Sequence, residues 1–160
     1  MRKTTLTFAL LLLILLMQSC IPTGNPVPVP TIVGLIENNQ SYCGGAAPPQ
    51  ELLDELAIFH ASANQTFYIR KGNFNTPFTP VYKTFTTDAL GNYSVQLPAG
   101  NYAVISEEKY FTESISDIDS TCDYLKTPDF NFVVTSIVQQ TYNKQFTKTC
   151  NYVCMPYLPG

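Results

Sequence analysis

The sequence contains no tryptophan and a single histidine, His60. A Ser-His-Asp or Cys-His catalytic arrangement would have to use this residue, because both need an imidazole as the base. Neither a G-x-S-x-G nor an H-E-x-x-H motif surrounds it. We therefore interpret His60 as a surface or helix-terminal histidine. The sequence predicts no catalytic residues and no enzyme.

Charged residues are also scarce, at 13% of the chain, and positive charge is the scarcer sign. Nine Lys and Arg against 12 Asp and Glu give a formal net charge of -3. The cations are scattered, so no basic stripe is available to neutralise a phosphate backbone. This composition argues against nucleic-acid binding.

The N-terminal apolar run, residues 8–17, is too short to cross a bilayer as a helix, which needs about 20 residues. It follows Arg2 and Lys3, and this pattern is typical of a secretory signal peptide, which we predict over residues 1–19. Ser19 stands directly before Cys20, and this resembles the lipobox of bacterial lipoproteins, whose cysteine is lipidated. The alternative is an ordinary signal peptide cut nearby, with Cys20 a spare thiol.

The residues after Cys20 bear on location. Ile21 stands where an Asp would suggest inner-membrane retention in Gram-negative bacteria. We therefore expect an exported protein that is lipid-anchored to the outer membrane, on its periplasmic or cell-surface side. Residues 20–30 include four prolines, which favour an extended, semi-rigid spacer.

The chain is rich in hydrophobic residues, at 45%, with ten Tyr and ten Phe, which is enough to build a core. From residue 31 onward, short β-rich segments alternate with turn residues, as in a sandwich. Tyr93, Val95 and Leu97 fall on one face of such a segment, the period-two pattern of a half-buried strand. Seven strands are predicted, at residues 31–37, 66–71, 81–86, 92–97, 101–107, 130–135 and 139–146.

One segment has helical spacing instead. Leu52, Leu53, Leu56 and Phe59 follow two prolines, and acidic residues occupy the first turns, where they complement the helix dipole. We predict a short amphipathic helix over residues 50–59, inserted between the first two strands. Its apolar stripe is expected to face the core, and the alternative is a partner-binding role.

Residues 87–102, TDALGNYSVQLPAGNY, form the most specific passage in the chain. They resemble the carboxypeptidase regulatory-like (transthyretin-like, prealbumin-like) domains of exported Bacteroidetes proteins, which show a TD-x-x-G-x-Y/F hairpin and a PAG-x-Y turn. The Asp88 side chain can close the hairpin turn, Gly91 supplies its positive φ, and Tyr93 is the aromatic position of the motif. Gly100 and Tyr102 look like a tyrosine corner, in which the hydroxyl bonds back to the backbone.

The resemblance implies an all-β fold, an Ig-like or prealbumin-like seven-stranded Greek-key sandwich with one inserted helix. It is strong over about residues 31–107 and weak beyond, and it implies a non-catalytic module. We place the domain over residues 31–160. The chain contains no carboxypeptidase metal motif, so the family name does not carry over as an activity.

Four cysteines remain after Cys20, and in an exported chain they predict two disulfides rather than a zinc site. If the strands alternate in direction, the cysteines that follow strands one, five and seven gather at one end of the sandwich, opposite the spacer. We expect Cys43 to pair with Cys150 or Cys154, and Cys122 to take the other.

Two weaker patterns share the acidic segment DIDSTCD. Alternate carboxylates can converge on calcium, so Asp117, Asp119 and Asp123 are weak candidates, but the glycine and the terminal glutamate of an EF-hand loop are missing. A solvated loop is the expected alternative. Ser120 stands in a short sequence that resembles the Bacteroidetes O-glycosylation acceptor. We expect no resident metal and no cofactor.

The leading functional hypothesis is a structural or binding module whose disulfide-stapled loops face away from the membrane, toward a protein or glycan ligand. The first alternative is a secreted protease inhibitor with a rigid exposed loop near the cysteines. The second is a glycan-active enzyme that uses acidic loop residues, which would need a concave pocket with perturbed carboxylates.

Overall fold

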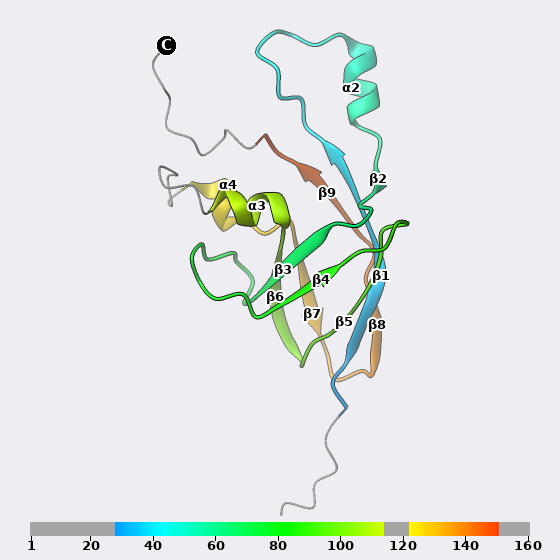
Figure 1. The fold of residues 1–160 in the computed structure, drawn as a ribbon, viewed down its shortest axis with the longest axis vertical. Coiled ribbons are helices and arrows are strands. Elements are labelled where there is room, and N and C mark those ends of the chain that lie inside the picture. Colours follow the sequence, from blue (N-terminus) through cyan, green and yellow to red (C-terminus); the bar gives the residue numbers. More distant parts are fainter. Residues whose placement is uncertain (1–27, 114–121, 151–160) are drawn as a thin grey trace, which may run out of the picture.

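Strand β1 (Thr31–Gln40) is the centre of the first of two β-sheets in a computed structural model that describes residues 28–113 and 122–150 (Figure 1). Its first half pairs antiparallel with β5 (Asn92–Gln96), and β2 (His60–Ala61) pairs antiparallel farther along. On its other side, β8 (Gln139–Thr141) and β9 (Lys144–Lys148) run parallel to it. The first and last strands of the described chain therefore lie side by side.

A local irregularity separates β8 from β9. Tyr142 and Asn143 interrupt the ladder opposite Gly34, where the Tyr142 amide donates to Val33 and the Asn143 side chain accepts from the Leu35 amide. A β-carbon on Gly34 would overlap the backbone carbonyl of Tyr142. Glycine is therefore needed here for the close approach of the two backbones.

The second sheet is antiparallel throughout, in the order β4-β3-β6-β7. Its strands are β3 (Thr66–Lys71), β4 (Lys83–Thr86), β6 (Gly100–Ser106) and β7 (Phe130–Val134). Two short helices continue from this sheet, α3 (Glu107–Thr112) directly after β6 and α4 (Asp123–Lys126) before β7.

The core lies between the sheets. Phe67, Phe85 and Phe132 contribute stacked and tilted rings, with centroids 5.3 to 6.3 Å apart. Tyr93 and Val95 are buried while their neighbours Ser94 and Gln96 are exposed, as the period-two pattern predicts. The remaining core side chains come from strands of both sheets and include Ile32, Ile36, Ile69, Leu97, Val104, Phe130, Val134 and Phe146. The prediction of an all-β sandwich is confirmed in its coarse form, because the described chain is mainly β-sheet, arranged in two sheets, with few short helices.

Each of the seven predicted strand segments contains a strand, and the last one divides into β8 and β9. The two-residue β2 and the helices α3 and α4 were not predicted. The helix α2 (Gln50–Leu56) is shorter than predicted, because the chain leaves helical geometry after Ala57.

The prediction that the apolar stripe of this helix faces the core is wrong. None of the residues of α2 is buried, Leu53 is 39% exposed, and Ile58 just beyond the helix is 54% exposed. The two sheets already enclose the core with their own strands. The insert between β1 and β2 instead extends past the end of β1 (Figure 1).

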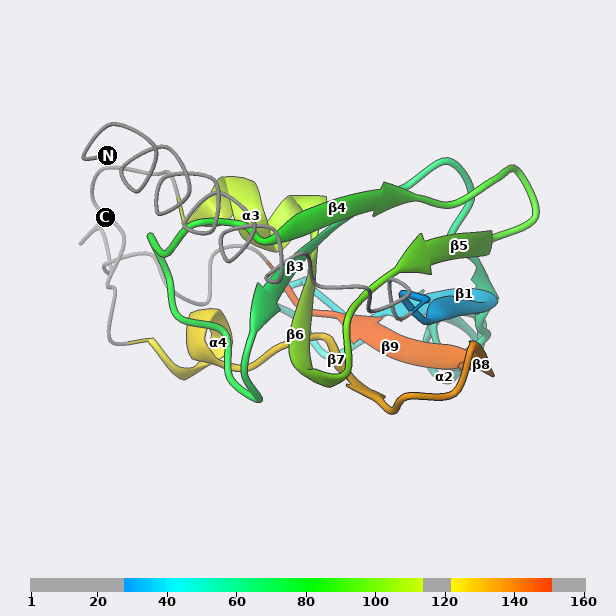
Figure 2. The same ribbon diagram turned by 90° about the horizontal axis from the view of Figure 1, so that it is seen from below.

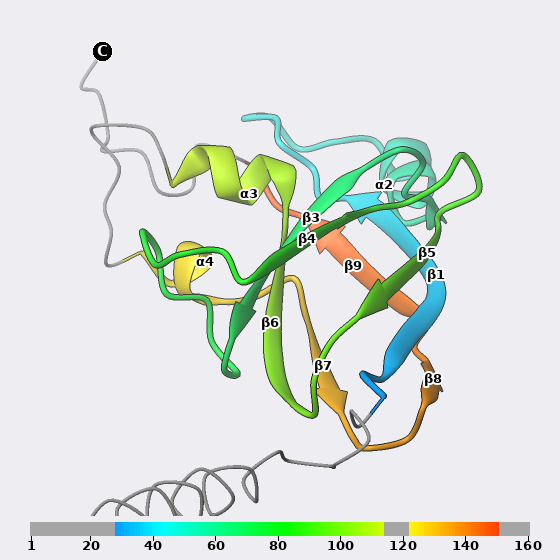
Figure 3. The same cartoon turned by 60° about the horizontal axis from the view of Figure 1, so that its bottom comes forward.

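The two ends of the sandwich differ in composition. At one end, here called the proline end, residues 28–30 enter β1 beside the β5–β6 and β7–β8 connections, through bonds from the Leu97 amide to Pro30 and from the Thr31 amide to Val138 (Figures 1 and 3). At the other, the disulfide end, β1 and β9 finish side by side. No helix in residues 28–113 or 122–150 has the length and apolar character to cross a membrane.

Candidate binding surface at the disulfide end

A disulfide between Cys43 and Cys150 joins the chain just after β1 to the chain just after β9, with Cα atoms 5.6 Å apart. Parallel neighbouring strands end at the same edge of a sheet, which is why two cysteines 107 residues apart meet there. This is one of the two pairings predicted for Cys43. Cys122 is also disulfide-bonded, and its partner lies outside the described residues, as does Cys154.

Two adjoining hollows lie at this end and share Asn38 and Lys148; together we call them the amide groove. One, of about 300 Å³, runs between α2 and the end of β1, and the other, of about 380 Å³, runs along the β2–β3 connection. Together with the charged side chains of Glu55, Glu107 and Lys148, five carboxamide side chains line the two hollows: Asn38, Asn39, Gln40, Asn64 and Gln65. A surface of this kind recognises hydrogen-bonding groups without needing a charged ligand.

Several of these amides are held in place by the fold. The side-chain nitrogen of Asn38 donates to the Ser62 hydroxyl (2.5 Å), and that of Gln40 donates to the Lys148 carbonyl (3.2 Å). In the described part of the chain, two buried side-chain oxygens have no hydrogen-bond partner, those of Asn39 and Gln65. Both residues line the amide groove. A buried acceptor without a donor is costly, so these two oxygens mark polar groups of the groove wall that the described fold leaves unsatisfied.

Helix α2 forms one wall of the groove and adds apolar surface to it. Leu52, Leu56 and Ile58 line the hollow, and Leu53 is exposed beside them. His60 lies at the same wall and is exposed, in agreement with a surface position. The groove therefore combines amide hydrogen-bonding groups with unburied aliphatic side chains.

The hairpin residues lie away from this surface and have structural contacts. Asp88 closes the β4–β5 turn by accepting from the amides of Leu90 and Asn92, each at 2.8 Å, and from the Asn92 side chain at 3.1 Å. These bonds, the Asn92 side chain first, hold the pKa of Asp88 below its ordinary value. Gly91 has a φ of +81°, which favours glycine.

The two tyrosines of the motif anchor neighbouring turns. The Tyr93 hydroxyl donates to the Tyr142 carbonyl at 2.8 Å, and burial raises the pKa of this phenol. The Tyr102 hydroxyl donates to the Pro98 carbonyl at 2.9 Å, across the turn that contains Gly100. These contacts stabilise the sandwich.

Other predicted site residues fall elsewhere. Cys20, Asp117, Asp119 and Ser120 lie outside the described residues, while Asp123 is the exposed first residue of α4. Within residues 28–113 and 122–150, no three His, Cys, Asp or Glu side chains are grouped so that they could hold a metal ion.

The β3–β4 connection, residues 72–82, is a feature that the sequence reasoning missed. Phe74 and Phe78 are 75% and 67% exposed and border an open hollow of about 460 Å³ together with Lys126. Phe78 has a positive φ of 64°, which is rare for an aromatic residue. The two phenylalanines and two prolines of the segment FNTPFTP were the available signal.

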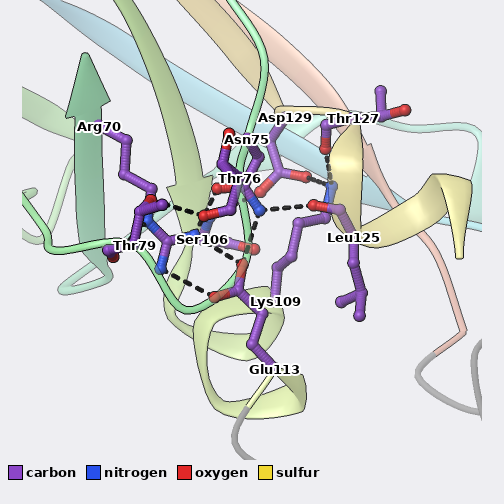
Figure 4. Close-up of polar contacts among 10 residues, drawn as sticks. All are labelled: Arg70, Asn75, Thr76, Thr79, Ser106, Lys109, Glu113, Leu125, Thr127 and Asp129. Atoms are coloured by element: carbon purple, nitrogen blue, oxygen red, sulfur yellow. Dashed lines mark hydrogen bonds and ion pairs between the residues drawn. The ribbon is translucent and has the colours of Figure 1, made fainter. Parts of the chain in front are cut away.

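A buried polar cluster holds this connection in place (Figure 4). Arg70 and Glu113 form a two-pronged ion pair, with both N···O distances 2.8 Å. Asn75 accepts from Arg70 (2.5 Å) and donates to Glu113 (2.6 Å) and to the Leu125 carbonyl (2.5 Å). The cluster thus ties β3, the β3–β4 connection, α3 and α4 together.

A second ion pair lies beside it. The Lys109 ammonium contacts Asp129 (2.7 Å) and donates to the Thr127 carbonyl (2.8 Å), and its side chain is 3% exposed. Asp129 also accepts from the amide of Ser106, the residue before α3. These contacts fix the start of α3 against the chain that leads into β7.

Comparison of the chain with family models, with curated proteins and with solved structures gave no match. The function is therefore argued from the geometry above.

Proposed function

We propose that the protein is a non-catalytic, lipid-anchored envelope module, and that its amide groove binds a partner polypeptide. The observation that carries this proposal is α2, an amphipathic helix with no buried residue, which forms the wall of a groove lined by amides. An apolar helix face that residues 28–113 and 122–150 leave uncovered is expected to be covered by another molecule.

A polypeptide fits this surface better than other ligands do. Its backbone groups can hydrogen-bond to exposed polar side chains of the groove such as Asn64, and its apolar side chains can cover Leu53 and Ile58. The Cys43–Cys150 disulfide restrains the insert that carries α2 close to its N-terminal side, and β2 restrains the other side. Restraint of this kind lowers the ordering cost of binding.

The lipid anchor and the orientation belong to the same proposal. A lipid on Cys20 would attach the chain on the N-terminal side of β1, whereas the amide groove lies at the C-terminal end of this ten-residue strand. A strand of that length spans roughly 33 Å. The groove would then face away from the membrane. A Greek-key arrangement of the carboxypeptidase regulatory-like type is the fold we propose to go with it.

The test uses photo-crosslinking from the groove in intact cells. A photoreactive residue at Leu53 should yield a defined adduct with one envelope protein, and the double variant Leu53→Glu/Ile58→Glu should abolish co-purification of that protein. The matched control is Leu90→Glu, which changes a 71% exposed leucine on the β4–β5 turn and should leave binding intact. If the parent protein, the Leu53→Glu/Ile58→Glu variant and the Leu90→Glu variant co-purify the same amount of the partner, the groove is refuted as the binding surface.

A second candidate function rests on the β3–β4 connection. The exposed rings of Phe74 and Phe78 beside an open hollow can stack on the apolar faces of sugar rings. Glycan-array binding that is lost in Phe74→Ala/Phe78→Ala, and kept in Leu53→Glu/Ile58→Glu, would favour a glycan ligand at this connection over a polypeptide in the groove.

A further inference from the structure

We infer that the proline end of the sandwich is a membrane-contact surface, which rests on a bilayer through exposed aliphatic side chains and two lysines. The inference rests on the proposed lipid anchor for its biological setting, but it concerns a different surface from the amide groove. It assigns the occupant as a phospholipid bilayer with anionic headgroups.

The first observation is a gathering of exposed aliphatic residues. Val29 is 46% exposed, and Ile137 and Val138 are each 62% exposed. Single exposed aliphatic residues are ordinary on protein surfaces, but these come from two distant segments that the fold places together. The Thr31 amide donates to the Val138 carbonyl at 2.8 Å, which holds the β7–β8 connection beside the start of β1.

A third segment completes the same end. The Leu97 amide donates to the Pro30 carbonyl at 3.0 Å, so the β5–β6 turn, with exposed Pro98 and Ala99, lies next to the entry of β1. Figure 2 looks onto this end and shows the start of β1, the β5–β6 turn and the β7–β8 connection spread across it. The three segments contribute small and aliphatic residues and no charged one between 28 and 30, 97 and 100, or 135 and 138.

The second observation is the sign of the nearest charges. The Lys83 ammonium donates to the Gln96 carbonyl at 2.8 Å, and Gln96 pairs with Thr31, the first residue of β1. Lys71 lies over the Tyr82 ring, and Gly72 next to it bonds to Asn101 at the start of β6. Both cations therefore flank the proline end. Lysines beside aliphatic residues suit an interface with anionic headgroups.

Carboxylates are placed elsewhere in the described structure. They lie in the second half of β1, in α2, on the β4–β5 turn, in α3 and α4, and just before β7: Glu37, Glu51, Asp54, Glu55, Asp88, Glu107, Glu108, Glu113, Asp123 and Asp129. Negative charge thus avoids the end that would approach anionic lipid, and it is abundant around the amide groove. This separation gives the molecule the electrostatic polarity that contact in one orientation requires.

The spacer permits contact. From Cys20 to Pro28 there are eight peptide units, which span about 29 Å at full extension and roughly 25 Å as polyproline II. The spacer enters at the proline end itself, so a lipid at Cys20 would keep this surface at high effective concentration near the bilayer. Weak contacts that would not hold a free protein are then sufficient to orient an anchored one.

The absence of tryptophan from the chain allows a direct test, because one introduced tryptophan is then the only indole and can be excited selectively at wavelengths that the ten tyrosines do not absorb. Residues 1–20 are replaced by a hexahistidine tag, and the protein is held on vesicles of nickel-chelating lipid, phosphatidylglycerol and phosphatidylcholine. All core residues lie at or after Ile32, so this change leaves the core intact. Ile137→Trp is compared with Ile58→Trp, which changes a 54% exposed residue at the disulfide end.

We expect Ile137→Trp emission to shift to shorter wavelength on vesicles and to be quenched by brominated lipid, while Ile58→Trp emission is unchanged. Lys71→Gln/Lys83→Gln should reduce the quenching at position 137 on anionic vesicles. Equal quenching of the two tryptophans, or no quenching of either, would overturn the inference. A blue shift at position 137 that appears without vesicles and grows with protein concentration would also overturn it, because such a shift indicates self-association.

The tag holds the protein on the vesicle whether or not Cys20 is lipidated in cells. Anchoring is tested separately by flotation of the natively expressed chain and of its Cys20→Ser variant with membrane vesicles. If the unsubstituted chain does not float but the quenching at position 137 is seen, the lipid anchor is refuted and the contact surface is retained. If only the unsubstituted chain floats and the quenching is absent, the anchor is retained and the contact surface is refuted.

Discussion

The side chains of Arg70 and Glu113 are 4% and 3% exposed, so their ion pair is almost fully removed from water. Removal of both charges from water costs several kcal/mol for each ion, which the mutual attraction and the hydrogen bonds from Asn75 must offset. Because a buried ion pair adds little net stability, its main role is to hold the surrounding backbone in one conformation. Here it fixes the β3–β4 connection that exposes Phe74 and Phe78.

Loss of one partner should therefore be severe. We expect Glu113→Gln to lower the free energy of unfolding by about 3 to 5 kcal/mol, because it leaves the Arg70 charge buried and uncompensated. The double variant Arg70→Met/Glu113→Leu should be less destabilised than the sum of its single variants, with a coupling of roughly 1 to 3 kcal/mol. Urea unfolding measures both quantities.

The matched control is Glu55→Gln, which removes an exposed carboxylate from α2 and should change stability by no more than about 0.5 kcal/mol. Additive effects in the Arg70 and Glu113 variants would contradict the role assigned to the pair.

Asp88 provides a pH-dependent counterpart at the surface. Its pKa is lowered in the folded protein by the bonds that it accepts in the β4–β5 turn, so the folded state favours the carboxylate. Its stabilising contribution is present in full above the ordinary carboxyl pKa near 3.8 and is lost as the pH falls from there through the lower pKa of the folded state. Asp88→Asn should thus melt at a lower temperature than the parent at pH 7 and approach it at pH 3. If the difference in melting temperature between the parent and Asp88→Asn is the same at pH 7 and pH 3, the negative charge of Asp88 does not contribute to stability.

At the level of elements, the strands could be predicted from the sequence because their signal is local. Alternation at Tyr93, Val95 and Leu97 shows which face is buried, and strand direction alone brought Cys43 and Cys150 to one end. The last predicted strand, residues 139–146, divides into β8 and β9, and only the final two residues of β9 lie beyond that range.

The exposure of α2 could not be predicted in the same way. Its leucine spacing is that of a core-facing helix, and whether a helix is covered depends on whether the rest of the chain leaves space for it. The Arg70–Glu113 pair was hidden for a similar reason, since its members are 43 residues apart and no local pattern connects them. The amide groove combines five carboxamides from β1 and the β2–β3 connection, which only the pairing of β1 with β2 and β9 brings together.

The disulfide is the element-scale feature with the clearest consequence. It closes a loop across 107 residues, and limiting the unfolded chain to that extent stabilises the fold by about 2 to 5 kcal/mol. We expect Cys43→Ser/Cys150→Ser to lose a stability in this range. Hydrogen exchange should also become faster in residues 41–49, which precede α2, while β3 and β6 retain their protection. Unchanged exchange in the insert would show that the disulfide does not restrain the groove wall.

On the scale of the whole molecule, the described chain is closed by contacts between its first and last strands. β1 is covered on one side by β5 and β2 and on the other by β8 and β9, and β9 supplies Phe146 to the core. The Phe146 ring contacts those of Phe67 and Phe130 from the second sheet, at 5.9 and 6.1 Å between centroids. The final strand therefore connects the two sheets as well as completing one of them.

This closure predicts opposite effects for two truncations. A chain that begins at residue 28 keeps every residue of the described core and should melt within a few degrees of the full chain. A chain that ends at residue 137 loses β8, β9, Phe146 and Cys150, so β1 is left with one unpaired edge beside an opened core. We expect it to show no cooperative thermal transition. A cooperative transition in the second chain, measured by calorimetry, would mean that the second sheet is stable without the last strands and that the sandwich is not a single cooperative unit.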